Sequence, residues 1–285
     1  MSNKPHIIVV AGPTASGKSD FAVTYALKHN GEIISADSRQ VYKGLTIGTG
    51  KITTEEMKGI THHMLDVYNT NEEVSVARFA RDTSPILADI LSRNKIPIIC
   101  GGTGQYIDAL IYKTSLPKVA PNKTLREKLE KKSTEELFTI VQKKDPRRAS
   151  TIDRHNRVRL IRALEIIESL GTVPSQDTPT LLYPTTMYLM SPTRETLRTR
   201  ITQRLEKRLK EGMIDEVRLL MEKGYTSSSM KKFGLEYVTI GKYLEGILTD
   251  EQMKKELIAK SMQYAKRQET WNKKYASFAI KIAVP

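Results

Sequence analysis

A glycine-framed loop that ends in lysine and serine follows the first apolar stretch of the chain. Gly12, Gly17, Lys18 and Ser19 match the pattern G-x-x-x-x-G-K-[ST], in which backbone N–H groups and the lysine bind phosphate while the hydroxyl reaches Mg²⁺. Residues 20–27 behind the loop have helical spacing, so we expect phosphate to bind at a helix N-terminus. The loop leaves the reaction open, because kinases, hydrolases and transferases of pyrophosphorylated substrates all use it.

Two more candidate side chains follow predicted strands. Asp37 comes directly after the short apolar strand predicted at residues 32–36, and Thr103 lies in the glycine turn that follows the strand at residues 96–100. Ligands of open α/β sheets collect at the carboxyl ends of the strands, so we expect both side chains to face the same crevice as Lys18. A structural role for Asp37, as a turn or N-cap residue, stays open.

The strands and helices expected around these residues indicate an α/β fold. We predict a P-loop NTPase-like parallel sheet flanked by helices. A strand is expected at residues 185–190, and the last apolar segment could close the sheet at residues 279–284. The expected helices of the core cover residues 74–93, 194–211, 214–223 and 249–275.

The composition changes near Pro117, where charged segments with helical spacing begin. We therefore expect a core domain of residues 1–117 and 184–285 with an all-helical insertion at residues 118–183. The helices expected in this insertion cover residues 125–131, 135–142 and 147–168.

The chain carries a formal net charge of +14, from 46 Lys and Arg against 32 Asp and Glu. This excess favours a polyanionic partner through counterion release, and a merely basic surface is the alternative. The arginines of the predicted insertion form either a solvated helix face or a surface that follows a phosphate backbone. Trp271 lies in a basic helix near the C-terminus, where it either stacks on a base or packs in the core.

Several kinds of site and location are disfavoured. Cys100 is the only cysteine, which excludes a disulfide framework, and its apolar neighbours favour a buried core residue. His62 and His63 have no further Cys or His nearby at ligand spacing, so we expect no metal site and either a loop or a role as satisfied histidines. We find no signal-like region and no apolar stretch near the length of a membrane span, which points to the cytoplasm.

Taken together, several motifs resemble those of the tRNA dimethylallyltransferases, also called tRNA isopentenyltransferases. They span nearly the whole chain in order, and the series is specific although the loop alone is generic. The chain ends soon after the last motif, without the zinc-finger extension of some eukaryotic relatives, so we expect an enzyme of bacterial type. The matching stretches are residues 12–19 (GPTASGKS), 36–42 (ADSRQVY), His62 with His63, 101–104 (GGTG) with Tyr106, 162–165 (RALE), and 265–268 (AKRQ) with Thr270 and Trp271.

The resemblance implies transfer of a dimethylallyl group from dimethylallyl diphosphate to N6 of the adenine at position 37 of tRNA, beside the anticodon, with release of diphosphate. Asp37 would take the proton of the poorly nucleophilic amine as the bond to the prenyl carbon forms, or would hold Mg²⁺ through water. Lys18, Thr103 and an arginine would stabilise the charge of the leaving diphosphate. By the family pattern this arginine is Arg204 in preference to Arg208.

The same resemblance assigns the ligand contacts, and we expect a monomer without a membrane partner. The diphosphate would bind the phosphate loop, with Mg²⁺ held through Ser19; the loop residues are Gly12, Pro13, Thr14, Ala15, Ser16, Gly17, Lys18 and Ser19. The anticodon stem-loop of tRNA would contact Asp37, Ser38, Arg39, Gln40, Thr103, Val158, Arg159, Leu160, Ile161, Arg162, Lys232, Phe233, Gly234, Leu235, Glu236, Lys266, Arg267, Gln268 and Trp271.

Three alternatives belong to other classes of protein. An adenylate isopentenyltransferase would prenylate a free nucleotide, but the predicted insertion and the charge of +14 argue against it. A P-loop kinase would bind ATP at the loop and would need a substrate lid with paired arginines. An RNA-binding protein with a vestigial loop is disfavoured because Lys18, Ser19, Asp37 and Thr103 are all intact.

Overall fold

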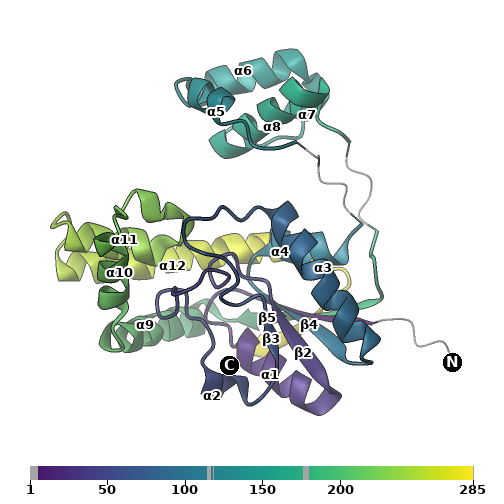
Figure 1. Ribbon diagram of the computed structural model, residues 1–285, viewed down its shortest axis with the longest axis vertical. Helices are drawn as coiled ribbons and strands as arrows, with labels where there is room; N and C mark the ends of the chain where they lie inside the picture. Colours follow the sequence, from purple (N-terminus) through teal and green to yellow (C-terminus); the bar gives the residue numbers. More distant parts are fainter. Residues whose placement is uncertain (1–5, 114–116, 118, 176–179, 285) are drawn as a thin grey trace. The chain divides into compact units, whose positions relative to one another are not determined.

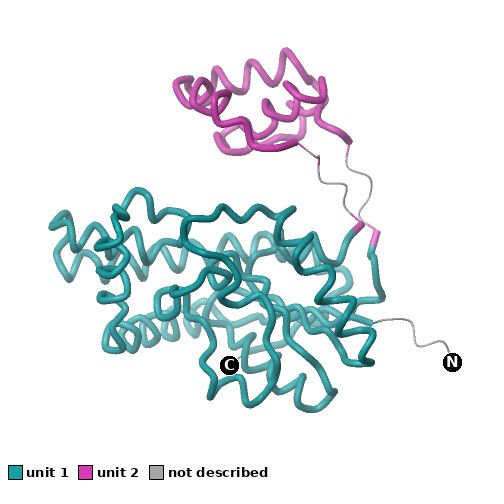
Figure 2. The backbone as a smooth tube through the Cα atoms, in the orientation of Figure 1, with its two compact units in different colours: residues 1–112, 181–285 teal, residues 113–180 magenta. Residues whose placement is uncertain are grey.

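The computed structural model describes residues 6–113, 117, 119–175 and 180–284. The chain divides into two compact units, unit 1 with residues 1–112 and 181–285 and unit 2 with residues 113–180 (Figure 2). The expected first residue of the helical insertion, Lys118, lies outside the described residues.

Unit 1 is built on a parallel β-sheet (Figure 1). In the described part of this unit the strand order is β3-β2-β4-β1-β5-β6, and every neighbouring pair is parallel. All five residues of the first strand are buried, as expected where helices cover both faces of a sheet. The sheet and its flanking helices confirm the predicted fold class. The strands are β1 (Ile7–Ala11), β2 (Gly31–Ser35), β3 (His62–His63), β4 (Ile96–Gly101), β5 (Thr185–Pro192) and β6 (Ile280–Val284).

Different helices cover the two faces of the sheet. Val10 of β1 belongs to the same buried cluster as Val23 of helix α1 (Lys18–His29). Val9, its neighbour on the opposite face, belongs to the cluster that includes Phe79 of α3 (Val76–Ser92) and Ile107 of α4 (Gly104–Ile111). Alternate residues of a strand point to opposite faces, so the continuous apolar run of β1 is what places helices on both sides.

The remaining α-helices described in unit 1 come before β3 and after β5. Thr249 starts the last long helix with a capping box, in which its N–H and hydroxyl pair with Gln252. These helices are α2 (Thr54–Met57), α9 (Arg194–Lys210), α10 (Met213–Glu222), α11 (Leu235–Leu244) and α12 (Asp250–Asn272).

Unit 2 is helical over its described residues and has a core of its own, which includes Leu137 and Leu160. The expectation of one helix over residues 147–168 is wrong. Two helices lie there, because the side chain of Asn156 accepts the N–H of Arg159 at 3.2 Å and so starts a new helix. The helices are α5 (Lys123–Leu129), α6 (Thr134–Lys144), α7 (Pro146–Ala149) and α8 (Arg157–Leu170).

The expected loop at His62 and His63 is instead the short strand β3, because its backbone pairs in parallel with β2. Both imidazole rings have partners, as predicted for satisfied histidines. Nδ1 of His62 lies 2.9 Å from the carbonyl oxygen of Ile60, and Nε2 of His63 lies 2.8 Å from the carboxylate of Glu32. The pair is therefore part of the edge of the sheet.

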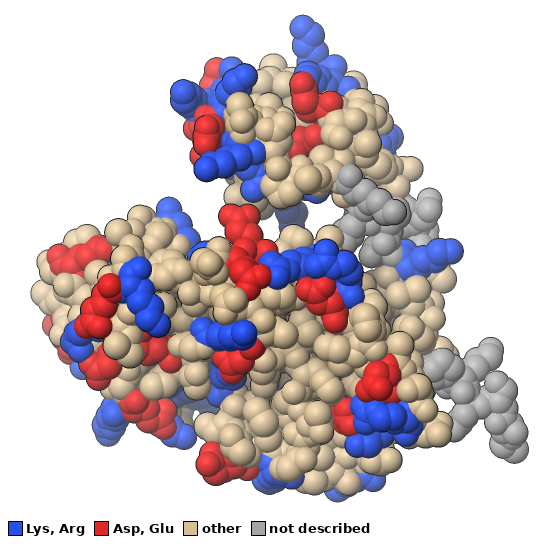
Figure 3. Space-filling model, viewed as in Figure 1, with Lys and Arg blue, Asp and Glu red and all other residues tan. Residues whose placement is uncertain are grey.

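Charged side chains of both signs are scattered over the visible face of each unit (Figure 3). Figure 3 shows Lys and Arg side chains on the visible face of both units, interspersed with Asp and Glu. None of the helices in the described ranges is both long and apolar enough to cross a membrane.

Candidate active site

The phosphate loop, residues 12–19, connects the carboxyl end of β1 to the first turn of α1. Gly17 precedes this helix with φ of 80°, in the left-handed region that favours glycine. Gly12 lies so close to β5 that a Cβ there would be 2.8 Å from Cβ of Met190. Helix α1 begins at Lys18, so the N–H groups and dipole of its first turn favour an anion at this loop.

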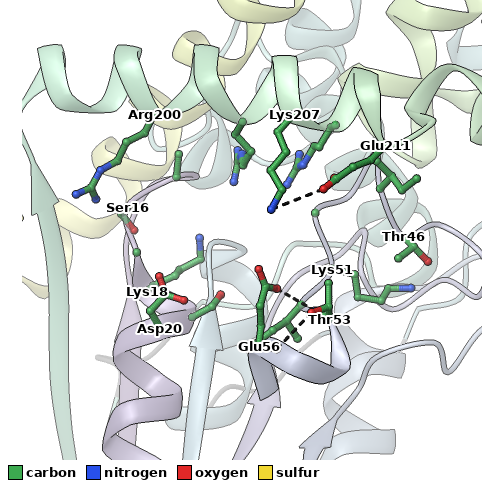
Figure 4. Close-up of a pocket in the computed structure, with 18 residues that line it drawn as sticks. Ser16, Lys18, Asp20, Thr46, Lys51, Thr53, Glu56, Arg200, Lys207 and Glu211 are labelled. Atoms are coloured by element: carbon green, nitrogen blue, oxygen red, sulfur yellow. Dashed lines mark hydrogen bonds and ion pairs between the residues drawn. The ribbon is translucent and has the colours of Figure 1, made fainter. Parts of the chain in front are cut away.

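A cavity of about 460 Å³ opens beside the phosphate loop. Arg200 and Lys207 project from α9 on one side of this cavity, and Lys18 lies on the opposite side (Figure 4). Acidic side chains are present as well, since Nζ of Lys207 is 3.6 Å from Oε1 of Glu211 and Glu56 also lines the cavity. A cavity that combines several cations with the N-terminus of a helix suits a phosphate or diphosphate group.

A second cavity of about 460 Å³ adjoins the first, because Lys18, Arg204 and Arg208 line both. Asp37 lies in its wall, so the structure brings Asp37 and Lys18 to one space. The predicted RNA contacts that line it are Arg39, Gly234, Leu235, Glu236, Arg267 and Gln268.

The carboxylate of Asp37 has a turn-forming role in addition to its place in the second cavity. Its Oδ1 accepts the N–H of Arg39 at 2.9 Å, which is the structural role that the sequence left open. The hydroxyl of Thr103 accepts the N–H of Ser38 at 3.0 Å, and the N–H of Thr103 donates to the carbonyl of Ala36 at 3.1 Å. Thr103 thus holds the segment that carries Asp37.

The cations shared by the two cavities are half-buried. Burial lowers the pKa of Lys18, whose Nζ donates to the carbonyl of Pro13 at 3.3 Å. Burial and the neighbouring Arg208 lower the pKa of Arg204 to about 9, and burial also lowers the pKa of Arg208. The guanidinium of Arg204 donates to the hydroxyl of Thr14 in the phosphate loop. An anion bound between these groups would compensate for the hydration that they lose on burial.

The RNA contacts predicted in unit 2 differ in exposure. Val158 is 77% exposed and Arg159 is exposed as well, whereas Leu160 and Ile161 belong to the buried core of that unit. Arg162 donates to the buried carboxylate of Glu165 at 3.2 Å and to a backbone carbonyl. Within this helix, the exposed residues are therefore the ones that can reach a partner.

The RNA contacts predicted in unit 1 also divide into surface and core residues. Lys266 is exposed on α12, whereas Phe233 is fully buried and packs edge-on against Tyr42. Burial raises the pKa of Glu236, which faces the second cavity. Trp271 is half-buried against Gly104, where a Cβ would lie 2.0 Å from its indole ring, so it packs against the core.

The side chains of Arg39 and Gln40 make internal hydrogen bonds. The guanidinium of Arg39 donates to the backbone carbonyl of Lys232. Gln40 donates to the carbonyl of Gly50 at 3.0 Å. The predicted RNA-contact segments after β2 and before α11 are thus joined to each other at the second cavity.

Comparison with known proteins places this geometry in a family. The sequence matches the IPP transferase family over residues 40–275. The chain belongs to the IPP transferase family. It is 37% identical to a tRNA dimethylallyltransferase of Pelotomaculum thermopropionicum, over 96% of this chain and 90% of that protein. A second relative, from Citrifermentans bemidjiense, is 39% identical over 98% of this chain and 90% of its own length.

Solved structures of the IPP transferase family share the fold as well. A tRNA isopentenylpyrophosphate transferase from Bacillus halodurans is 35% identical and superimposes with a TM-score of 0.74, covering 99% of this chain and 90% of that one. A eukaryotic dimethylallyltransferase acting on tRNA is 28% identical with a TM-score of 0.85, over 98% of this chain and 74% of that chain. These likenesses confirm the predicted family and its prenyltransferase class.

Glu216 was not singled out by the sequence analysis, but its carboxylate fixes a backbone segment that lines both cavities. Glu216 of α10 accepts the N–H groups of Thr46 and Ile47 at 2.8 Å and that of Gly48 at 2.9 Å. It also accepts the hydroxyl of Tyr237 at 2.6 Å. Thr46 and Ile47 line the first cavity and Gly48 lines the second. The sequence carries no signal for this, because Glu216 is one of several charges on an amphipathic helix.

Neither Cys100 nor a cluster of metal-ligating side chains adds a reactive group to the part of the chain that the structure describes. Burial raises the pKa of the Cys100 thiol to about 11, so the thiol stays protonated as expected for a core residue. Over residues 6–113, 117, 119–175 and 180–284, no three or more His, Cys, Asp or Glu side chains are grouped to hold a metal ion.

Replacing Glu216 by Ala is expected to lower the free energy of unfolding by about 2–3 kcal/mol, because three backbone donors and one hydroxyl lose their acceptor. Urea denaturation measures this change. The matched control is Glu222→Ala, an exposed position on the same helix, where we expect a change within about 0.5 kcal/mol. Equal stabilities of the two variants would contradict this role of Glu216.

Proposed function

We propose that this protein transfers the dimethylallyl group of dimethylallyl diphosphate to N6 of adenine 37 in tRNA, next to the anticodon, and releases diphosphate. The observation that carries the proposal is the pair of adjoining cavities, one at the phosphate loop and one at Asp37, which share Lys18, Arg204 and Arg208. Such a pair suits two substrates that meet at a row of cations. Relatives named tRNA dimethylallyltransferase support the same reaction.

The phosphate loop would bind the diphosphate of the donor. The carbon–oxygen bond of the donor breaks, its electron pair stays on the diphosphate, and N6 of adenine bonds to the freed carbon. The loop amides, Lys18 and Arg204 would stabilise the negative charge that accumulates on the leaving oxygen. The bond between Arg204 and Thr14 supports this assignment, because it places the guanidinium at the loop itself.

Asp37 would orient the exocyclic amine and accept its proton as the carbon–nitrogen bond forms. Its place in the wall of the second cavity, which it shares with Lys18, supports this role. Thr103 would act with it, because its hydroxyl holds the N–H of Ser38 beside that carboxylate.

The available donors suit Mg²⁺, a hard cation that prefers oxygen ligands and keeps several waters. The exposed hydroxyl of Ser19 at the end of the phosphate loop and the carboxylate of Asp37 are such oxygens. We propose that Ser19 would hold Mg²⁺, together with Asp37 through water. Bound there, Mg²⁺ would neutralise charge on the diphosphate.

A base inside an anticodon loop must flip out of the base stack to reach such a cavity. The protein must bind the RNA firmly while the base is flipped out. The net charge of +14 supports this step through counterion release. We propose that the exposed positions Val158 and Arg159 of unit 2 and Lys266 and Arg267 of α12 contact the tRNA. We also propose that the enzyme acts in the cytoplasm as a monomer.

The test is transfer of radiolabelled dimethylallyl from its diphosphate by the purified protein. We expect label on unmodified tRNA, at adenine 37, and none on AMP. Label on AMP alone would instead indicate an adenylate isopentenyltransferase. Steady ATP turnover without prenyl transfer would indicate a kinase.

Replacing Asp37 by Ala or Asn is expected to slow transfer roughly 10²- to 10⁴-fold, because the amine loses its proton acceptor. Single-turnover kinetics at saturating tRNA measure the step, and filter binding should show nearly unchanged tRNA affinity. Asp215→Asn, an exposed carboxylate on α10, is the control and should retain full activity. A loss of tRNA affinity with normal turnover of the bound complex would make Asp37 a binding residue.

Replacing Arg204 by Gln is expected to reduce turnover by about 10²-fold, because one charge-assisted contact to the leaving diphosphate is lost. The KM for dimethylallyl diphosphate should rise, whereas tRNA affinity should change little. Arg198→Gln provides the control, since Arg198 is exposed on the same helix. The assignment fails if Arg204→Gln and Arg198→Gln have the same turnover.

A further inference from the structure

Gln268 of α12 joins the two loops that form the carboxyl edge of the site. Its side-chain oxygen Oε1 accepts the N–H of Thr14 in the phosphate loop at 2.8 Å. Its Nε2 donates to the carbonyl of Gly102 at 3.1 Å, in the glycine turn after β4. The side chain is 6% exposed, so both ends of the carboxamide are used inside the protein.

The fit between this helix and the glycine turn is close. A Cβ on Gly102 would lie 2.0 Å from Nε2 of Gln268, and a Cβ on Gly104 would lie 2.0 Å from the indole ring of Trp271. Gln268 and Trp271 are three residues apart, which places them on one face of α12. Glycine at both positions of the turn is therefore what lets the helix approach.

Helix α12 is itself fixed beside the site. Ala265 is fully buried in a cluster with Leu197 and Ile201 of α9, and Ala15 of the phosphate loop packs against that cluster. Just beyond the helix, the hydroxyl of Tyr275 donates to the carboxylate of Asp108 on α4 at 2.6 Å. The carboxamide of Gln268 thus projects from an anchored support.

Contacts connect Gln268 to Arg204 at the phosphate loop and to the segment that carries Asp37. On one side the backbone N–H of Thr14 donates to Gln268, and the hydroxyl of Thr14 accepts from Arg204. On the other side Gly102 precedes Thr103, whose hydroxyl holds the N–H of Ser38 next to Asp37. The leaving-group side and the base side of the site are therefore linked through one carboxamide.

We propose that Gln268 is a positioning residue that sets the spacing between the phosphate loop and the turn of residues 101–104. This inference rests on the proposed function and assigns Gln268 to the transfer step, not to RNA binding. A misplacement of about 1 Å between reacting groups can cost 10²-fold in rate, so the spacing that Gln268 sets acts on turnover. The role needs a group that accepts at one end and donates at the other.

The test compares Gln268→Glu and Gln268→Met with Gln263→Glu, an exposed glutamine on the same helix. We expect turnover at saturating substrates to fall about 10- to 10²-fold in both Gln268 variants. The tRNA dissociation constant should stay within about twofold of wild type, and Gln263→Glu should match wild type throughout.

The pH dependence separates positioning from a general loss of structure. In Gln268→Glu the introduced carboxylate can accept from Thr14 but repels the carbonyl of Gly102, and on protonation it regains a donor. Burial, Asp37 and Glu236 raise the pKa of this carboxyl group, whereas the cations that line the same cavity lower it; these are Lys18, Arg39, Arg204, Arg208, Lys231, Lys260 and Arg267. Its rate deficit relative to wild type should therefore shrink as the pH falls toward that pKa. The deficit of Gln268→Met should be independent of pH.

Three outcomes would overturn the inference. Normal turnover in both Gln268 variants is the first, and a fall in tRNA affinity that accounts for the whole loss of activity is the second. The third is a pH-independent deficit in Gln268→Glu equal to that of Gln268→Met. If either variant fails to fold, Gly102→Ala, whose new methyl group would displace Nε2, must show the same loss of turnover. A wild-type protein without transfer to tRNA would refute the proposed function itself.

Discussion

The site depends on the parallel pairing of β1 with β4 on one side and with β5 on the other. Ala11, the last residue of β1, pairs with Gly101 of β4 and with Leu189 of β5. The phosphate loop, the glycine turn and the chain toward α9 therefore leave the sheet at one edge, which is where ligands of parallel sheets bind. Close approach at this edge requires glycine, since a Cβ on Gly101 would lie 2.2 Å from the carbonyl oxygen of Ala36.

The charges at this edge suit a ligand that brings negative charge with it. Burial lowers the pKa of Lys18, Arg204 and Arg208, so each cation has lost part of its hydration. A diphosphate would supply strong acceptors for all three groups. The loop recognises phosphate in either case, and the relatives named tRNA dimethylallyltransferase favour prenyl transfer over the hydrolysis or transfer of a phosphoryl group.

Sequence patterns predicted the parts of the site that follow apolar strands, because chain order and strand direction place the phosphate loop, Asp37 and Thr103 at one edge. The patterns could not predict contacts between distant side chains and backbone. Glu216 binds N–H groups up to 170 residues away, and nothing in α10 distinguishes it from its charged neighbours. Motif membership also does not say which way a side chain faces. Leu160 lies in the core of unit 2, and Gln268 is bonded inside unit 1.

The central claim is that the phosphate loop binds a prenyl diphosphate opposite a base held at Asp37. A crystal structure with an unreactive thiolo analogue of dimethylallyl diphosphate and an anticodon stem-loop tests this claim most directly. The account predicts diphosphate oxygens on the N–H groups of residues 17–19 in the phosphate loop and adenine N6 within hydrogen-bond distance of the Asp37 carboxylate. A diphosphate bound away from this loop, or an adenine whose N6 faces away from Asp37, would contradict it.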